Sequence, residues 1–313
     1  MLYGSYRFQC RLENDAVLPF YKGSTFRGVF GIALKKVVCA LKRQKCENCL
    51  LRTRCLYTQV FETSLAAEPP EELRGSAVPH PFIIEPPVTG YTDFKAGARL
   101  ACGLLLFGEV NRNLPYFIYA FDRMGKIGIG RKIDGRRAGY TLERVLQGER
   151  VIYDSADQHV SLEDTCWELK LHSKKKKLNG HRQLKIVLET PLRLKFKNHF
   201  QAELPFHILV RAMLRRVSAL LACYGAGEPD LDYRGLVRQA EDIRISDNRL
   251  DWFDWRRYSN RQNQAMLMGG MIGSVTYEGN FAGYLPLLDF CSRVHIGKQT
   301  SFGLGKIHLQ VGP

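Results

Sequence analysis

Hydrophobic and polar residues alternate along residues 6–12, in the order Tyr, Arg, Phe, Gln, Cys, Arg, Leu. This period of two predicts a strand with one buried face. A helix is predicted next, because the spacing changes to every three or four residues, at Phe26, Phe30, Leu34, Val37 and Leu41. Ser24 or Thr25 is a suitable N-cap for this helix.

The same order of elements returns in the second half of the chain. Residues 184–196 predict a strand interrupted at Pro191, and residues 205–224 predict an amphipathic helix. Three arginines of this helix fall outside its apolar stripe: Arg211, Arg215 and Arg216.

Two longer stretches extend the similarity between the halves. Residues 114–131 and 285–306 each begin with Leu-Pro, continue as an apolar segment and end in glycines and cations. A strand that carries two glycines precedes each stretch, at residues 103–108 and 273–279. These matches indicate an internal repeat.

Each half therefore runs strand, helix, strands, helix, glycine turn and strand, which is the order of a ferredoxin-like unit. We expect an α+β fold with two tandem ferredoxin-like, RRM-like domains, at residues 1–176 and 177–313. The boundary is placed beside the four lysines 174–177, because a run of like charges rarely enters a core. Sheets of this type have an open face that suits single-stranded RNA.

The last glycine-rich stretch has the residue types of an anion-binding loop. Glycines 297, 303 and 305 let backbone N–H groups approach a ligand, and Lys298 and Lys306 supply positive charge. The predicted ligand is a phosphate, and the residues predicted to bind it are Gly297, Lys298, Gly303, Gly305 and Lys306. The alternative is an ordinary glycine turn.

Charge narrows the range of partners. The 313 residues carry a formal net charge of +15, which favours nucleic acid first and an acidic membrane surface second. The sequence has no apolar run long enough for a membrane span and no signal-peptide core at residues 1–15. We expect a cytoplasmic protein that is not inserted in a membrane.

Four cysteines follow the first helix with the spacing C-x6-C-x2-C-x5-C, at Cys39, Cys46, Cys49 and Cys55. Four thiolates suit a tetrahedral zinc ion, and the short C-x2-C segment provides two of them from one turn. We expect a structural zinc site that holds the first helix and its loop. An iron–sulfur cluster has the same four-thiolate requirement, and ligand-free cysteines are the third possibility.

Two further stretches have the character of a nucleic-acid surface. On the first helix, Arg27 and Lys35 lie near Gly28 and Gly31, which indicates a close approach to the backbone, either by a ligand or by tight packing. In the second half, aromatic residues and cations alternate in residues 252–262, which include Arg257 and Arg261.

The tandem unit, the turn at residues 23–28 and the terminal glycine loop resemble the RAMP superfamily of CRISPR RNA-binding proteins. More specific matches resemble the bacterial branch of the CRISPR repeat-processing endoribonucleases, over nearly the whole chain. These matches are the segment Arg27-Gly28-Val29-Phe30-Gly31, the four cysteines, residues 81–87, residues 258–262, the Gly269-Gly270-x-x-Gly273 segment and residues 295–305.

This resemblance implies an endoribonuclease that binds the repeat of precursor CRISPR RNA. It implies cleavage without a catalytic metal, with a 2′,3′-cyclic phosphate as product and other CRISPR effector subunits as possible partners. Ile32 stands where this branch can have its histidine, and His295 falls in the glycine loop where the branch often has one. His295, Tyr21 and Lys35 are thus the implied catalytic residues, and Lys22, Ser24 and Arg27 the implied RNA contacts of the first helix.

Three alternatives stay open. His295 could simply cap the helix that precedes it. Ile32 favours a non-catalytic RAMP subunit that binds repeat RNA without cutting it. The four cysteines would also suit a cluster-bearing redox or sensing protein.

Overall fold

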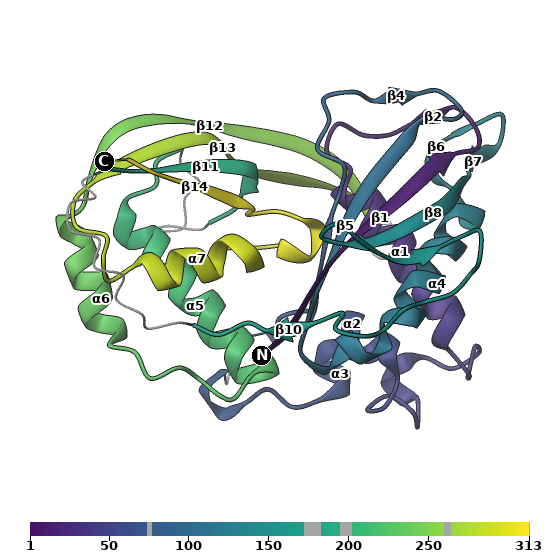
Figure 1. The fold of residues 1–313 in the computed structure, drawn as a ribbon, viewed down its shortest axis with the longest axis horizontal. Helices are drawn as coiled ribbons and strands as arrows, with labels where there is room; N and C mark the ends of the chain where they lie inside the picture. Colours follow the sequence, from purple (N-terminus) through teal and green to yellow (C-terminus); the bar gives the residue numbers. More distant parts are fainter. Residues whose placement is uncertain (74–76, 172–182, 195–201, 260–263, 313) are drawn as a thin grey trace. The chain divides into compact units, whose positions relative to one another are not determined.

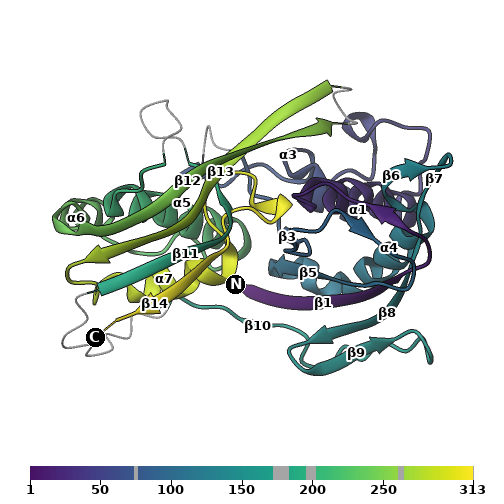
Figure 2. The same cartoon turned by 90° about the horizontal axis from the view of Figure 1, so that it is seen from above.

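The computed structural model describes residues 1–73, 77–171, 183–194, 202–259 and 264–312. It divides into two compact units, residues 1–168 with 223–225, and residues 169–222 with 226–313 (Figures 1 and 2). The predicted boundary after residue 176 lies outside the described residues.

The first unit is a sheet with helices packed on one face. Its helices are α1 (Gly23–Val38), α2 (Leu56–Phe61), α3 (Thr63–Ala66) and α4 (Leu114–Ile127). Its strands are β1 (Leu2–Leu12), β2 (Ala16–Val17), β3 (Phe82–Glu85), β4 (Asp93–Phe94), β5 (Arg99–Phe107), β6 (Ile129–Ile133), β7 (Arg136–Ala138), β8 (Tyr140–Gln147), β9 (Arg150–Asp154) and β10 (Trp167–Glu168). The main sheet has the antiparallel order β3-β5-β1-β8-β9, with β10 paired to β1.

The second unit has the same topology. Its helices are α5 (Phe206–Tyr224), α6 (Tyr233–Gln239) and α7 (Leu285–Val294), and its strands are β11 (Gln183–Leu192), β12 (Arg244–Ser259), β13 (Gln264–Glu278) and β14 (Ile307–Val311). The sheet order is β12-β13-β11-β14, all antiparallel. In both units the first and third strands are central, which is the ferredoxin-like arrangement. The predicted α+β fold is thereby confirmed.

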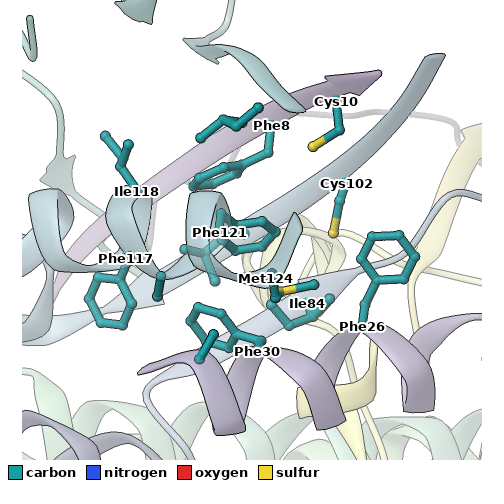
Figure 3. Close-up of a cluster of buried hydrophobic side chains, with 14 of the residues drawn as sticks. Phe8, Cys10, Phe26, Phe30, Ile84, Cys102, Phe117, Ile118, Phe121 and Met124 are labelled. Atoms are coloured by element: carbon teal, nitrogen blue, oxygen red, sulfur yellow. The ribbon is translucent and has the colours of Figure 1, made fainter. Parts of the chain in front are cut away.

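The core of the first unit explains why the two periodicities produce these elements. The alternate residues of β1 that are buried meet the apolar stripes of α1 and α4 (Figure 3). Phe121 stacks on Phe8 with ring centroids 3.9 Å apart, and Phe30 lies 5.2 Å from Phe121. Burying one such ring stabilises the fold by about 1.5–3 kcal/mol, so α1 is firmly attached to the sheet.

Two local predictions are wrong. Helix α1 begins at Gly23, and its N-cap is Lys22, which makes no side-chain cap bond, so neither Ser24 nor Thr25 has that role. Arg216 is buried, although Arg211 and Arg215 on the same helix are exposed as expected. Within the described ranges, no helix is long and apolar enough to cross a membrane.

Candidate nucleic-acid interface

The glycine loop between α7 and β14 is closed by its own backbone. Gly297, Gly303 and Gly305 all have φ near +80°, at +85°, +85° and +78°. The N–H groups of the loop donate to protein oxygens at 2.7–3.0 Å, in the bonds Ile296 to Gly305 O, Lys298 to Arg193 O, Gly303 to Thr300 O, Gly305 to Pro191 O and Lys306 to Thr190 Oγ1. These five donors have acceptors within the protein, so they could bind a phosphate only by giving up those bonds. Phosphate binding by this loop stays a prediction.

Packing explains why the loop needs glycine. A Cβ on Gly297 would lie 2.7 Å from the carbonyl oxygen of Arg193, and a Cβ on Gly305 would overlap the carbonyl of Ile296. The loop is pressed against the end of β11, and this packing favours the ordinary-turn alternative. Of its two cations, Lys298 is exposed, whereas the Lys306 ammonium lies 3.4 Å from Glu189.

His295 joins this loop to α7. It is the C-cap residue of the helix, with φ +53°, and only 1% of its surface is exposed. Its Nδ1–H donates to the carbonyl oxygen of Leu304 at 3.0 Å, since a carbonyl can only accept. Buried Arg216 donates to the carbonyl oxygens of Val294 and His295 at 3.0–3.2 Å, a favourable place for a cation at a helix C-terminus.

This environment is that of a structural histidine. A ring buried to this extent reaches an RNA hydroxyl only if the loop opens. Catalysis by His295 is an untested prediction that the geometry does not favour.

Two predicted residues before α1 are also buried. The ammonium of Lys22, 1% exposed, donates to the carbonyl oxygens of Phe20 and Thr89 at 3.2 and 3.0 Å. Burial lowers the pKa of Lys22. Burial, and then the charge of Glu85, raises the pKa of Tyr21, so its phenol stays protonated at neutral pH. The bond to Thr89 joins Lys22 to the segment before β4, and an RNA contact by Lys22 stays a prediction.

Arg27 is held in a defined position by residues far away in the sequence. Its Nη2 lies 3.1 Å from Nε2 of His80, and its guanidinium carbon lies 5.1 and 5.8 Å from the ring centres of Phe61 and Phe82. His80 Nδ1 lies 2.9 Å from the carbonyl oxygen of Val60, so Nδ1 carries the proton and Nε2 accepts from Arg27. The sequence analysis missed His80, because only the fold brings it to α1.

The outer face of α1 is open. Gly28, Ile32 and Lys36 are exposed, and a Cβ on Gly28 would meet nothing within 4 Å. Gly31 differs, because a Cβ there would lie 2.9 Å from the ring of Phe61, which accounts for that glycine by tight packing. A ligand can therefore approach α1 along Gly28. Ser24, the other predicted contact, is part-buried at the start of the helix.

Lys35 borders this face and stays positively charged at neutral pH. Its ammonium lies 5.1 Å from the centre of the Tyr57 ring. Burial lowers the pKa of Lys35, but the charges of Cys46, Tyr57 and Cys39 and a hydrogen bond with Cys46 outweigh that effect, and the net pKa is raised. Lys35 can therefore stabilise an anion but is not suited to accept a proton.

The four cysteines after α1 do not form a ligand set in this arrangement. Cys39 is the C-cap of α1, Cys46 begins a 3₁₀ turn that Cys49 follows, and Cys55 precedes α2. Among the described residues, no three His, Cys, Asp or Glu side chains are grouped closely enough to hold a metal ion. Structural zinc and the iron–sulfur alternative remain predictions.

Replacing both Cys46 and Cys49 with serine tests the zinc prediction. If zinc is bound, its binding energy is also folding energy, so the double variant should lose metal and melt at a lower temperature. Metal analysis and thermal denaturation measure both effects, and absorbance near 400 nm would reveal an iron–sulfur cluster instead. One metal per chain in both proteins would rule out these two ligands, and none in either would rule out the site.

A two-stranded ribbon carries the aromatic and basic segment of the second unit. Strand β13 pairs with β11 only from Met271 onward, whereas its pairing with β12 continues to Ser259 and Gln264. Arg256 on this ribbon is exposed. Arg257 lies in β12, but its side chain is outside the described residues, as is the whole of Arg261. Their RNA contacts stay predictions.

The open face of the first sheet contains a basic hollow that the sequence analysis did not single out. Its volume is about 450 Å³, and its arginines come from three strands: Arg7, Arg11, Arg99 and Arg144. Glu143 lies 2.5 Å from Arg11 and 3.7 Å from Arg99, and Asp154 lies 2.7 Å from Arg144. Four guanidinium groups against two carboxylates leave positive charge for a phosphate or nucleotide chain.

Two family models match the chain. The model AF_1859_N, described as an N-terminal domain, matches residues 1–165. The model of the CRISPR-associated endoribonuclease Cas6 matches residues 186–307. An uncharacterized protein of Archaeoglobus fulgidus is 25% identical over 291 residues, which cover 92% of this chain and 91% of that relative.

Several solved structures with a similar fold match nearly the whole chain. Thermus thermophilus Cas6 matches with a TM-score of 0.53 and 12% identity, over 99% of this chain and 98% of that one. A Cas6 product complex matches with a TM-score of 0.57 and 13% identity, over 98% of this chain and 100% of that one. A partial Cas6-RT-Cas1 and Cas2 complex reaches 0.59 at 13% identity, over 99% of this chain and 46% of that one. At these identities the likeness shows a shared fold.

Proposed function

The chain belongs to the AF_1859_N family and carries a Cas6-type domain at residues 186–307, and from this premise we propose that it is a CRISPR repeat-RNA endoribonuclease. The family-level prediction, a RAMP-type protein of CRISPR RNA processing, is confirmed by these matches. The proposed reaction is metal-independent cleavage of the repeat of a precursor CRISPR RNA through attack by a 2′-hydroxyl.

The observation that carries this proposal is the match of the second unit to the Cas6 endoribonuclease model, on a chain that has the Cas6 fold over both units. Charge supports it independently, because a net charge of +15 suits a polyanion. The open face of α1, the basic hollow and the β12–β13 ribbon each offer exposed cations to RNA.

The chemistry follows from the nucleophile. The 2′-oxygen attacks the adjacent phosphorus, and the bond from phosphorus to the 5′-oxygen of the next nucleotide breaks. A base removes the 2′ proton and an acid protonates the 5′-oxygen, so the products are a 2′,3′-cyclic phosphate and a 5′-hydroxyl. The RNA supplies its own nucleophile, so the protein must supply proton transfer and stabilise the charge on the phosphate oxygens.

The protein must transfer protons and stabilise negative charge on the phosphate. The described residues meet the second requirement better than the first. Lys35 stays protonated beside the open face of α1, and Arg27 is fixed on the same helix. Tyr21 and His295, the other predicted catalytic residues, are both buried, so acid–base work by either would require a rearrangement.

A non-catalytic RAMP subunit that binds repeat RNA is the second candidate function. The exposure of Ile32 on α1, at the position where this branch can have a histidine, favours it. Such a subunit would act with other CRISPR effector proteins, which are proposed partners under either function. The solved complex of Cas6-RT-Cas1 with Cas2 is an example of such an assembly in another protein.

Incubation of the purified protein with its repeat RNA in EDTA separates the two functions. Cleavage at one position in the repeat, with no products from a scrambled RNA of the same length, is expected for the endoribonuclease. Tight binding to the repeat without any product would leave only the non-catalytic function. Failure to bind the repeat more tightly than the scrambled RNA would contradict both.

A further inference from the structure

The first copy of the internal repeat, residues 114–131, leads into an exposed hairpin, β6–β7. No role has been given to this hairpin so far. Asp134 and Gly135 connect its strands with φ values of +48° and +78°. Positive φ at both central residues is the geometry of a type I′ turn, which suits the twist of a two-residue hairpin. Ile133 pairs with Arg136 directly before the turn, so the hairpin is a formed structure.

The charge of this hairpin is strongly unbalanced. Four cations are exposed on it, namely Arg131, Lys132, Arg136 and Arg137, against the single carboxylate of Asp134. Among the described residues none of the four makes an ion pair, and Arg137 donates to the backbone carbonyl of Gly130. Unneutralised cations close together repel one another, a cost that a polyanionic partner would remove.

The hairpin is firmly supported by its own unit. A Cβ on Gly130 would overlap the carbonyl oxygen of Val17 and lie 2.9 Å from Leu18 Cδ2, so β6 packs tightly on β2. Strand β6 also contacts α1, which carries Arg27 and Lys35. Strands β6 and β7 lie in the same unit as α1 (Figure 2), so the four cations are carried on a fixed support within that unit.

The two copies of the repeat differ in what they expose to solvent. In the second copy, residues 300–305 of the glycine loop are buried and five backbone donors of the loop are used within the protein. The first copy instead extends into a hairpin with exposed cations. The first copy therefore has the chemistry that the sequence analysis expected of the second.

We infer that the β6–β7 hairpin is a phosphate-binding arm for the RNA backbone, in the same unit as the open face of α1. This inference rests on the proposed function, since it takes the repeat RNA as the occupant. The contacts should be independent of sequence, because arginine and lysine side chains that meet phosphates carry no base information. They should also depend strongly on salt, through release of counterions.

The test compares two triple variants that lose the same charge. One changes Arg131, Lys132 and Arg136 to Gln, and the control changes three exposed arginines of α5 and α6 to Gln: Arg211, Arg234 and Arg238. Binding of repeat RNA and of an unrelated RNA is measured across a salt series. Each lost phosphate contact reduces the slope of log affinity against log salt by about 0.7, so the hairpin variant should lose about two units with both RNAs.

Each possible outcome either supports or overturns the inference. Loss of slope in the hairpin variant, with the control at the wild-type slope, supports it. An unchanged slope in the hairpin variant, or an equal change in both variants, overturns the arm while leaving the proposed function intact. Wild-type protein that binds neither RNA overturns the proposed function and the arm together. Binding to vesicles of anionic lipid is compared for the wild type and the hairpin variant as well. If the hairpin variant loses vesicle binding but keeps RNA binding, the hairpin contacts a membrane surface and the inference is overturned.

Discussion

Replacing Lys35 with alanine is expected to slow cleavage of the repeat RNA by roughly 10²- to 10³-fold. The physical reason is that Lys35 is a protonated side chain beside the open face of α1, where the proposed function places the charge that develops on the phosphate in the transition state. Single-turnover cleavage at saturating protein measures this effect, because it keeps RNA affinity out of the rate.

Lys36 provides a matched control. It is the next residue on α1, it is exposed, and its removal changes the net charge by the same amount. Lys36→Ala should lower RNA affinity slightly and leave the saturated rate near that of the wild type. Equal slowing of both variants would show a general effect of charge, and a wild-type rate for Lys35→Ala would remove Lys35 from the reaction.

Replacing His295 with alanine is expected to reduce the free energy of unfolding by about 2–4 kcal/mol. The substitution removes a buried ring and the hydrogen bond to Leu304, and it leaves a cavity between α7 and the glycine loop. Chemical denaturation measures this cost. At a temperature where the variant is folded, single-turnover cleavage should remain close to the wild-type rate.

His295→Asn separates structure from acid–base catalysis. Asparagine can donate a hydrogen bond to Leu304 but cannot titrate near neutral pH. It should recover part of the lost stability and keep the rate. A loss of 10²- to 10⁴-fold in rate with stability intact would instead restore His295 as the acid or base, as the resemblance implied.

The fold could be predicted from the sequence because its signals are local and repeated. The alternation in β1 and the helical spacing of α1 each depend on one buried face, and each recurs in the second half, at β11 and α5. The same order of strands and helices occurs twice, with similar glycine turns. This repetition restricts the topology to two similar domains in tandem.

The acceptors of the glycine loop's N–H groups could not be predicted in this way. A loop rich in glycine can aim its N–H groups at a ligand or at another strand. Three of the five partner oxygens belong to Thr190, Pro191 and Arg193 on or beside β11, about a hundred residues earlier in the sequence. Nothing within residues 295–306 indicates that contact.

Long-range packing also decides which cations face solvent. Lys22 and Arg27 are five residues apart, yet one is buried against loop carbonyls and the other lies against His80 and two phenylalanine rings. The basic hollow is a similar case. The alternation of β1 puts Arg7 and Arg11 on one face, but the sheet order alone places Arg99 and Arg144 beside them.

The most direct test of the central claim is cleavage of a repeat RNA with 2′-deoxyribose at the single nucleotide before the cut, compared with the all-ribose repeat, both in EDTA. A 2′-hydroxyl nucleophile predicts that the all-ribose repeat is cut to a 2′,3′-cyclic phosphate, and that the deoxy-substituted repeat binds equally well but stays intact. Cleavage of the deoxy-substituted repeat at the same position, or products that form only when a divalent metal is added, would contradict the account.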